Sequence, residues 1–277
     1  MPGTLYLVAT PIGNLDDITL RAIKILNEVD FIAAEDTRHS LKLLNHLEIS
    51  KPLISYHRHN EDVKSELLIE KLLDNKNIAL ITDAGTPAIS DPGEEIVKLC
   101  IENEINVVPI PGACALINAL ITSGLDTTEF NFIGFLPLNK KNRKEKLDKI
   151  KTCTSTAILY EAPHKITSTL KDLNEIIGYR KIVLARELTK IHEEFIRGTA
   201  SELLEKIENP KGEFVIIIEK SNISETTNLD FLNTVSLEEH YNFYAKQGLK
   251  KNDIIKKVAK DRNTNKNEIY QKFLKES

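Results

Sequence analysis

Short apolar runs alternate with amphipathic stretches along the first 112 residues. The runs are nearly continuous, as in strands that are buried on both faces, and they cover residues 4–9, 31–34, 52–55, 78–82 and 106–110. Between them, apolar residues recur at steps of three and four, which predicts helices over residues 18–29, 40–47, 61–73 and 94–102. This alternation predicts a mostly parallel sheet with helices on both of its faces.

The next hundred residues repeat the alternation less regularly. A helix over residues 113–123 joins the two halves, and strands are expected at residues 130–134, 156–160, 181–185, 194–197 and 214–219. Helices are expected at residues 141–150, 166–177 and 201–207. The short strand near Phe195 is expected to pair antiparallel. The pattern therefore predicts two tandem α/β domains, spanning residues 1–112 and 113–222.

The character of the chain changes after residue 222. Residues 223–235 are polar and lack periodicity, as in a linker. Residues 236–277 form a pattern of three short helices, with Gly248 ending the first and residues 263–265 turning between the second and third, which is typical of a helix-turn-helix. This tail carries ten Lys or Arg and six Asp or Glu, a charge of +4, so the remainder of the −4 chain carries −8. A basic tail on an acidic body suits a tethered contact with nucleic acid, although a solvated helical cap has the same pattern.

Composition excludes several other classes of protein. The three cysteines (Cys100, Cys114 and Cys153) form no C-x-x-C pair, so neither a disulfide framework nor a zinc site is expected. The first residues lack a basic leader, and no apolar stretch approaches about eighteen residues. We therefore expect a cytoplasmic protein that does not cross the membrane.

The loop after the fourth predicted strand carries the strongest signal for a ligand. Residues 82–93 read TDAGTPAISDPG and are rich in small residues, which allow the backbone to approach a flat ligand closely. Ligands of parallel α/β sheets bind at the carboxyl ends of the strands, where this loop lies. Neither G-x-G-x-x-G nor a P-loop is present, so the loop matches no standard dinucleotide or nucleotide motif.

Two further strand ends carry groups that can move protons or hold phosphate. Glu35, Asp36 and Arg38 follow the second strand, where a carboxylate can accept a proton and an arginine can bind a phosphate, although a helix cap with an ion pair explains them equally well. His57 and His59 lie after the third strand, together with Arg58. Histidine titrates near neutrality, but a solvated loop is the alternative and the signal for a metal is weak.

Eight segments together resemble the tetrapyrrole methylase superfamily, and in particular its ribosomal RNA branch. In order, they are VATPIGNLDD, AAEDTR, ITDAGTPAISDPG, PGACA, GFLP, LYEAPHKI, ARELTKIHEE and KGEFVIIIE. The resemblance runs from Gly3 to about Lys220, and the basic tail is similar to the extension of that branch. It implies two tandem α/β domains with a cofactor cleft between them, a small helix-turn-helix-like extension and a homodimer. It also implies S-adenosylmethionine as methyl donor, with no metal.

The resemblance also implies which residues contact the cofactor. The positions that match the family's contacts are Pro11, Asp83, Ala84, Gly85, Thr86, Ile89, Cys114, Ala115, Glu161 and Leu188. Porphyrin-modifying relatives usually carry Gly-Asp-Pro in the loop after the fourth strand, whereas this chain has Gly85-Thr86-Pro87. That departure favours the ribosomal RNA branch over a tetrapyrrole substrate.

The resemblance implies methylation of the 2'-oxygen of a cytidine ribose in 16S RNA of the small ribosomal subunit. A base that takes the hydroxyl proton would help, because a hydroxyl is a weak nucleophile. The candidates are Glu35 and Asp36, with His57 or His59 as alternatives, while Arg38 and Arg58 are placed to grip phosphates. Three rival functions are a tetrapyrrole methyltransferase, a helix-turn-helix regulator with a ligand-sensing α/β body, and an RNA-binding assembly factor.

Overall fold

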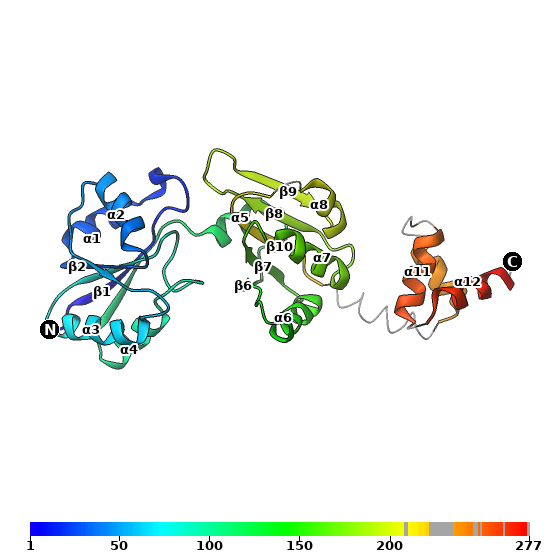
Figure 1. Cartoon of the computed structure of the whole chain (residues 1–277), viewed down its shortest axis with the longest axis horizontal. Helices are drawn as coiled ribbons and strands as arrows, with labels where there is room; N and C mark the ends of the chain where they lie inside the picture. Colours follow the sequence, from blue (N-terminus) through cyan, green and yellow to red (C-terminus); the bar gives the residue numbers. More distant parts are fainter. Residues whose placement is uncertain (208–209, 222–234, 246–248, 250, 263, 276–277) are drawn as a thin grey trace. The chain divides into compact units, whose positions relative to one another are not determined.

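A computed structural model describes residues 1–207, 210–221, 235–245, 249, 251–262 and 264–275. The chain divides into two compact units (Figure 1). The first comprises Met1–Ile150 and Ser155–Glu219 and holds both sheets. The second comprises Lys151–Thr154 and Lys220–Ser277.

The first sheet is entirely parallel, as the continuous apolar runs predict. Its strands lie in the order β3-β2-β4-β1-β5, with bounds β1 Thr4–Val8, β2 Phe31–Ala34, β3 Leu53–Ser55, β4 Ile78–Ile81 and β5 Asn106–Ile110. The central strand β4 is buried at every position. Because all five strands run in one direction, their carboxyl ends lie along one edge of the sheet.

Helices cover both faces of this sheet (Figure 1). The residues of α1 (Leu20–Glu28) and α2 (Thr37–His46) contribute to one core cluster, and those of α3 (Glu61–Leu73) and α4 (Glu94–Glu102) to another. Asp16 and Asp17 precede α1 without capping it. These two residues lie in the 3-10 turn η1 (Leu15–Asp17), and the Thr19 hydroxyl caps α1 by accepting from the Ala22 N–H at 3.1 Å.

The second sheet is mixed rather than parallel. Its order is β6-β7-β10-β8-β9, with bounds β6 Phe130–Phe135, β7 Thr156–Glu161, β8 Ile182–Arg186, β9 Glu194–Gly198 and β10 Phe214–Ile218. Only β6 and β7 pair in parallel, and β10 runs antiparallel to both of its neighbours. The predicted antiparallel strand near Phe195 is confirmed as β9.

Four helices accompany the second sheet, namely α5 Ala115–Ser123, α6 Lys140–Thr152, α7 Ile166–Ile176 and α8 Ala200–Lys206. Helix α5 packs on β7, β8 and β10 through Leu116, Ala119 and Leu120, which share a core cluster with strand residues. The predicted pair of α/β folds is thus confirmed. Within the part of the chain that the structure describes, no helix is long and apolar enough to cross a membrane.

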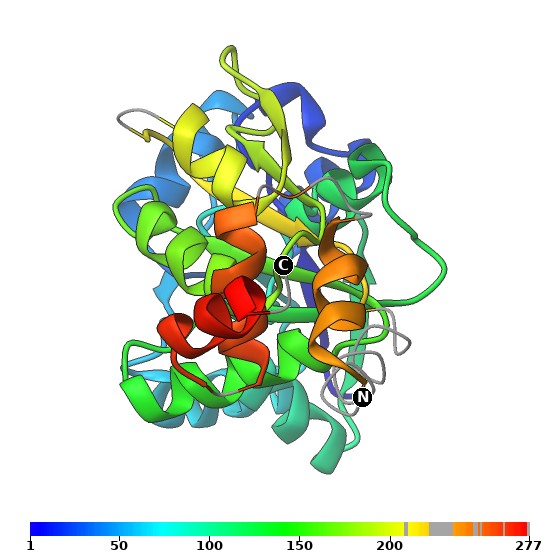
Figure 2. The ribbon, with the colours of Figure 1, turned by 90° about the vertical axis from the view of Figure 1, so that its right-hand side faces the viewer.

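The C-terminal unit contains the three predicted helices, which are drawn from orange to red in Figures 1 and 2. They are α10 Leu237–Ala245, α11 Lys251–Asp261 and α12 Lys266–Lys275. Their small core contains Tyr244, Ile254, Ile255, Val258, Ala259 and Ile269. The predicted linker up to residue 234, and the predicted helix end at Gly248, lie outside the described residues, as does Asn263 of the predicted turn.

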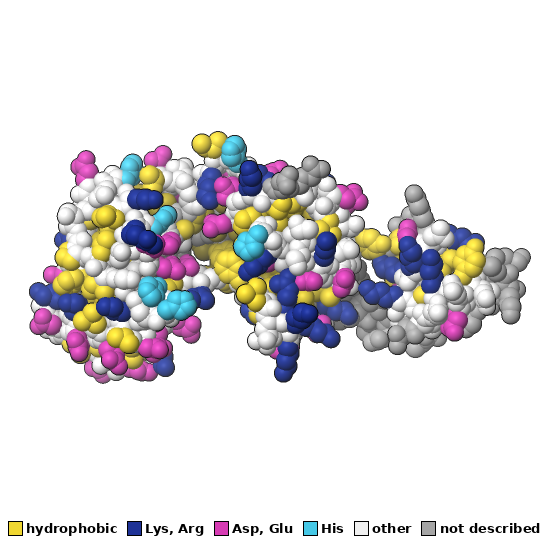
Figure 3. Space-filling model, viewed as in Figure 1, with side chains coloured by type: hydrophobic (Ala, Val, Ile, Leu, Met, Phe, Trp, Pro, Cys, Tyr) yellow, Lys and Arg dark blue, Asp and Glu magenta, His cyan; other side chains and the backbone are white. Residues whose placement is uncertain are grey.

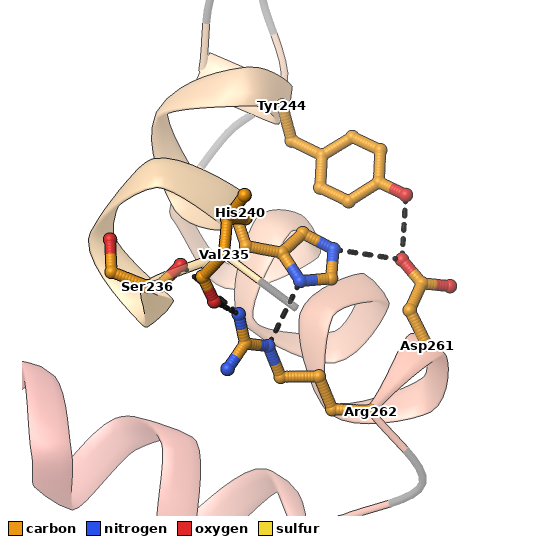
Figure 4. Close-up of polar contacts among 6 residues, drawn as sticks. All are labelled: Val235, Ser236, His240, Tyr244, Asp261 and Arg262. Carbon is orange, nitrogen blue, oxygen red and sulfur yellow. Dashed lines mark hydrogen bonds and ion pairs between the residues drawn. The ribbon is translucent and has the colours of Figure 1, made fainter. Parts of the chain in front are cut away.

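A buried polar cluster joins α10 to the end of α11 (Figure 4). His240 is fully buried, and its Nδ1 accepts a hydrogen bond from the Arg262 Nε at 3.0 Å. The ring proton therefore lies on Nε2, which faces the Asp261 Oδ2 at 3.3 Å. The Tyr244 hydroxyl donates to the same carboxylate oxygen at 2.6 Å, and Arg262 also donates to the Ser236 carbonyl at 3.0 Å.

The cluster makes the stability of the C-terminal unit depend on pH. Burial, reinforced by the Arg262 guanidinium, lowers the pKa of His240, while Asp261 opposes the shift. In the unfolded chain the imidazole takes up a proton near pH 6.5, whereas in the folded unit it stays neutral at that pH. The free energy of unfolding therefore falls as the pH drops through that value. We expect the backbone amides of α11 to lose hydrogen-exchange protection between pH 7.5 and 5.5, after correction for intrinsic rates.

The matched control for this prediction is the exposed His46, because His46→Gln should leave that pH dependence unchanged. His240→Gln should remove it, whatever it does to stability at neutral pH. Equal protection of wild-type α11 at both pH values would contradict the assignment of a neutral, buried imidazole.

Candidate functional site

The first unit contains a cavity of about 490 Å³ that is lined by loops of both sheets. Loops after β1, β2, β4 and β5 line one wall, and residues at the ends of β6, β7, β8 and β10 line the other. Figure 3 shows the hollow on the surface of this unit, with apolar side chains inside it. The volume lies in the range that holds a cofactor or a small ligand.

Most of the predicted cofactor positions line this cavity. They are Asp83, Ala84, Gly85, Thr86, Ile89, Cys114, Ala115, Glu161 and Leu188. Pro11 does not line it; its neighbour Ile12 does, and Pro11 lines a separate cavity of about 50 Å³ together with His39 and Ser40. Adjacent residues of a loop point in different directions, and the contact of Pro11 with the cofactor stays a prediction.

Reciprocal backbone hydrogen bonds join the loop after β4 to the loop after β1. The Thr10 N–H donates to the Gly85 carbonyl at 2.9 Å, and the Gly85 N–H donates to the Thr10 carbonyl at 3.0 Å. Gly85 has a φ of +84°, and a Cβ there would lie 3.3 Å from Cγ2 of Ile12. The Thr86 hydroxyl donates to the Ala113 carbonyl at 3.2 Å, so three strand-end loops are tied together at one wall of the cavity.

The same loop holds an unusual backbone conformation farther along. Ala88 and Ser90 have φ values of 68° and 66°, in the left-handed region that costs non-glycine residues energy. The Arg58 guanidinium donates to the Ser90 carbonyl, and the Glu61 carboxylate accepts from the Gly93 N–H at 2.9 Å. The segment after β3 thus fixes the conformation of the loop that carries Ile89 and Asp91 into the cavity.

Aromatic rings and a buried carboxylate form part of the opposite wall. The Tyr160 hydroxyl accepts from the Leu116 N–H at 3.2 Å, and its ring contacts Phe132 and Phe135 edge to face, at centroid distances of 5.0 and 5.7 Å. Glu161 is buried and accepts from the Thr169 hydroxyl at 2.6 Å. Two elements of the second sheet therefore present fixed side chains to the cavity.

The loop after β8 reaches the cavity with a paired charge. Glu187 accepts from the Lys190 Nζ at 2.8 Å and from the Glu213 N–H at 3.2 Å, and the Lys190 ammonium lowers the pKa of Glu187. A Cβ on Gly13 would lie 2.5 Å from Cγ of Lys190, so the loop after β1 lies directly against this segment. Leu188 lies between Glu187 and Lys190, and all three residues line the cavity.

Three carboxyl groups from the first sheet gather at the cavity wall. Burial raises the pKa of Asp91 to about 7, helped by the negative charges of Glu35 and Asp83. Burial and Asp83 likewise raise the pKa of Glu35, while Arg58 and His57 oppose the shift. Asp83 is anchored by the backbone, because its Oδ1 accepts from the Asp36 N–H at 3.1 Å. The cluster can accept a proton near neutrality or attract a cation.

The structure separates the predicted catalytic residues. Only Glu35 lines the cavity. Asp36 caps α2 and pairs with the exposed Arg38, Oδ2 to Nη2 at 3.0 Å, and the hydrogen bonds from Arg38 lower the pKa of Asp36 to about 2. This is the helix cap with an ion pair that the sequence left open for this pair. His57 is half-buried and bonded to Asn60, and His59 is exposed.

Sequence reasoning missed several residues that line the cavity, among them Ile12, Ser90, Asp91, Phe135, Tyr160 and Glu213. Each lies in or beside a segment that follows a predicted strand or precedes one. The signal was therefore present in the position of the segment, but not in the residue type. Among the described residues, no group of three or more His, Cys, Asp or Glu side chains is arranged to hold a metal ion.

The two sheets and the cavity at their strand ends define an α/β protein with a ligand site. Residues 4–204 match the family model of the tetrapyrrole (corrin/porphyrin) methylases, and the chain belongs to this family. A solved structure with the same fold is the uroporphyrin-III C-methyltransferase from Thermus thermophilus in complex with S-adenyl homocysteine. The superposed region covers 78% of this chain and 97% of the chain of that structure, with a TM-score of 0.55 and 18% sequence identity.

Curated relatives match almost the whole chain. A protein of Halalkalibacterium halodurans is 47% identical over 276 residues, covering 99% of this chain and 96% of the relative. A protein of Bacillus subtilis is 47% identical over 274 residues, covering 98% and 94%. Both relatives bear the name ribosomal RNA small subunit methyltransferase I.

The turn at Gly85 yields a prediction about stability. Gly85 and Gly124 both have positive φ, but a Cβ at Gly124 would meet nothing within 4 Å, whereas one at Gly85 would press on Ile12. We expect Gly124→Ala to lower the free energy of unfolding by about 1 kcal/mol through backbone strain alone, and Gly85→Ala to lower it by about 2 kcal/mol or more. Urea unfolding of both variants measures the difference. Equal losses would show that Ile12 tolerates the extra methyl.

Proposed function

We propose that this protein transfers a methyl group from S-adenosylmethionine to the 2'-oxygen of a cytidine ribose in 16S RNA of the small ribosomal subunit. The observation that carries the proposal is the cavity, which gathers nine of the ten positions that the family resemblance assigns to the cofactor. The names of the near-full-length relatives support the substrate. We further propose a cytoplasmic homodimer, as the family resemblance implies.

The residues around the cavity fit S-adenosylmethionine. Its volume of about 490 Å³ accommodates a ligand of that size, and Ala84 and Gly85 leave the backbone open to a flat group. The carboxyl groups of Glu35, Asp83 and Asp91 suit a cationic ligand. Ile12 lines the wall beside Pro11, whose contact with the cofactor is implied by the resemblance and stays a prediction.

S-adenosylmethionine, when bound, supplies a methyl group on a positively charged sulfur that an oxygen nucleophile can attack directly. The side chains of this protein then have to position the ribose, exclude water and accept the hydroxyl proton. Asp91 and Glu35 line the cavity with raised pKa values and are the proton acceptors that we propose, and Asp91 has a pKa near the working pH. Asp36 and Arg38 are engaged with each other at the start of α2.

The basic C-terminal unit supplies a second contact for RNA in this proposal. Its helices carry exposed lysines, including Lys251, Lys256 and Lys260. Such charges hold RNA through its phosphates and without regard to sequence. The rival regulator would use the same helices to read duplex DNA, but the match of 47% to the curated methyltransferases favours an enzyme.

The direct test is transfer of labelled methyl groups from S-adenosylmethionine to small subunits isolated from cells that lack the gene. We expect incorporation of one methyl per subunit, on a cytidine 2'-oxygen when the modified nucleotide is mapped. Subunits from cells that contain the gene serve as the control and should accept none. Methylation of a base nitrogen, or transfer to a tetrapyrrole instead of the subunit, would overturn the proposal.

The raised pKa of Asp91 predicts the pH dependence of the reaction. The base acts in its ionised form, so the single-turnover rate should rise with pH and level off above about 7. Asp91→Asn should abolish that rise and lower the rate by roughly 10²- to 10⁴-fold. Glu35→Gln removes a negative neighbour and should move the midpoint to lower pH.

The exposed Glu94 on α4 provides the control for charge removal, and Glu94→Gln should leave the profile unchanged. If Asp91→Asn keeps the pH-dependent rise while Glu35→Gln loses it, the proton acceptor is Glu35. If both variants keep the wild-type rate and profile, neither carboxyl group takes part in proton transfer.

A further inference from the structure

Phe135 is an aromatic residue in an unusual position. It is the last residue of β6 and lines the cavity, yet 51% of its surface is exposed. The ring thus combines a place in the cavity wall with apolar surface that is open to water, and this position lets it contact a ligand that enters the cavity. Aromatic rings at such sites stack on unpaired bases of RNA.

The surroundings of Phe135 hold the ring in place. It contacts the ring of Tyr160 edge to face at 5.7 Å, and Tyr160 in turn contacts Phe132 at 5.0 Å. The Leu116 N–H donates to the Tyr160 hydroxyl and so fixes the Tyr160 ring between the two phenylalanines. Phe135 is thus backed on one side by a fixed aromatic pair and open to solvent on the other, which makes it a rigid platform.

The chain continues from Phe135 directly into the most basic helix of the first unit. Helix α6 carries seven Lys or Arg and two acidic residues among Lys140–Thr152, and Figure 3 shows basic side chains gathered over it. Arg143 pairs with Asp172, and Lys146 donates to the Ile133 carbonyl, so these two cations serve the fold. Lys140, Lys141 and Lys144 are exposed.

We infer that residues 135–144 form the surface that presents the target nucleotide to the cavity. In this arrangement Phe135 stacks on the base of that nucleotide, and Lys140, Lys141 and Lys144 neutralise phosphates on neighbouring nucleotides. The inference rests on the proposed function and adds the part of the site that recognises RNA. It assigns Phe135 to positioning the substrate rather than to the methyl transfer itself.

Geometry and charge support this division of roles. Bringing a ribose into the cavity draws its nucleotide away from the neighbouring bases, and a ring that stacks on the displaced base compensates for the lost stacking. Lys140 follows Phe135 by five positions, and a chain extends by about 3.6 Å per residue, so the two Cα atoms lie at most about 18 Å apart. The lysines can therefore reach phosphates within a few nucleotides of the stacked base.

The test for Phe135 is a comparison of leucine variants at the two ends of one strand. Phe130 begins β6, is 42% exposed and does not line the cavity. We expect Phe135→Leu to raise the KM for small subunits by roughly 5- to 100-fold, as loss of one base–aromatic stack does, and to leave the dissociation constant for S-adenosylmethionine within about twofold. Phe130→Leu should change neither value, and Phe135→Trp should restore the wild-type KM.

The test for the lysines is the salt dependence of subunit binding. Lys140→Gln, Lys141→Gln and Lys144→Gln combined should reduce the slope of log affinity against log salt by about 2, because each phosphate contact on single-stranded RNA contributes about 0.7. The exposed Lys98 on α4 provides a single-site control, and Lys98→Gln should keep the wild-type slope.

The outcomes distinguish a failure of the inference about Phe135 from a failure of the proposed function. Methyl transfer by the wild-type protein together with a wild-type KM in Phe135→Leu would overturn the inference alone. A loss of affinity for S-adenosylmethionine in that variant would also overturn it, because the ring would then serve the cofactor. If the wild-type protein transfers no methyl to subunits, the proposed function fails and the inference fails with it.

Discussion

The parallel pairing of the first sheet is the constraint on which the site depends. All five strands of this sheet run in one direction, so the loops that follow them lie along one edge. The polar side chains of these loops lie along the same edge. The reciprocal hydrogen bonds between Thr10 and Gly85 then join two of these loops into one wall. A strand of opposite direction in this sheet would carry its following loop to the other edge and leave the wall incomplete.

The second sheet contributes to the cavity wall through strands of both directions. Its central strand β10 is antiparallel to both neighbours, so the cavity wall on this side is made from the ends of some strands and the start of another. Tyr160, Glu161 and Leu188 reach the cavity from β7 and from the loop after β8, while Glu213 and Phe214 reach it from the start of β10. The mixture of strand directions lets three separate segments of sequence face one ligand.

Acidic and basic side chains gather on different elements of the first unit. Burial and the negative charges of neighbouring carboxyl groups raise the pKa values of Glu35 and Asp91, an arrangement that costs stability and is typical of sites that bind cations or move protons. The exposed lysines of α6 belong to the other α/β half. The acidic wall and the basic helix therefore suit the two ligands of an RNA methyltransferase, a cationic cofactor and an anionic polymer.

The sequence by itself determined the strand–helix order, the parallel first sheet and the position of residues 82–93 as a small-residue loop at the end of a strand. Apolar periodicity and small residues report such local structure directly. Family resemblance added Cys114, Ala115, Glu161 and Leu188, all of which line the cavity. Only the tertiary structure decided that Ile12 rather than Pro11 faces the cavity, that Asp36 is engaged with Arg38, and that Asp91 stands beside Glu35. The direction of a side chain within a loop depends on backbone dihedrals fixed by distant contacts, such as that of Arg58 with Ser90, and these contacts leave no local pattern in the sequence.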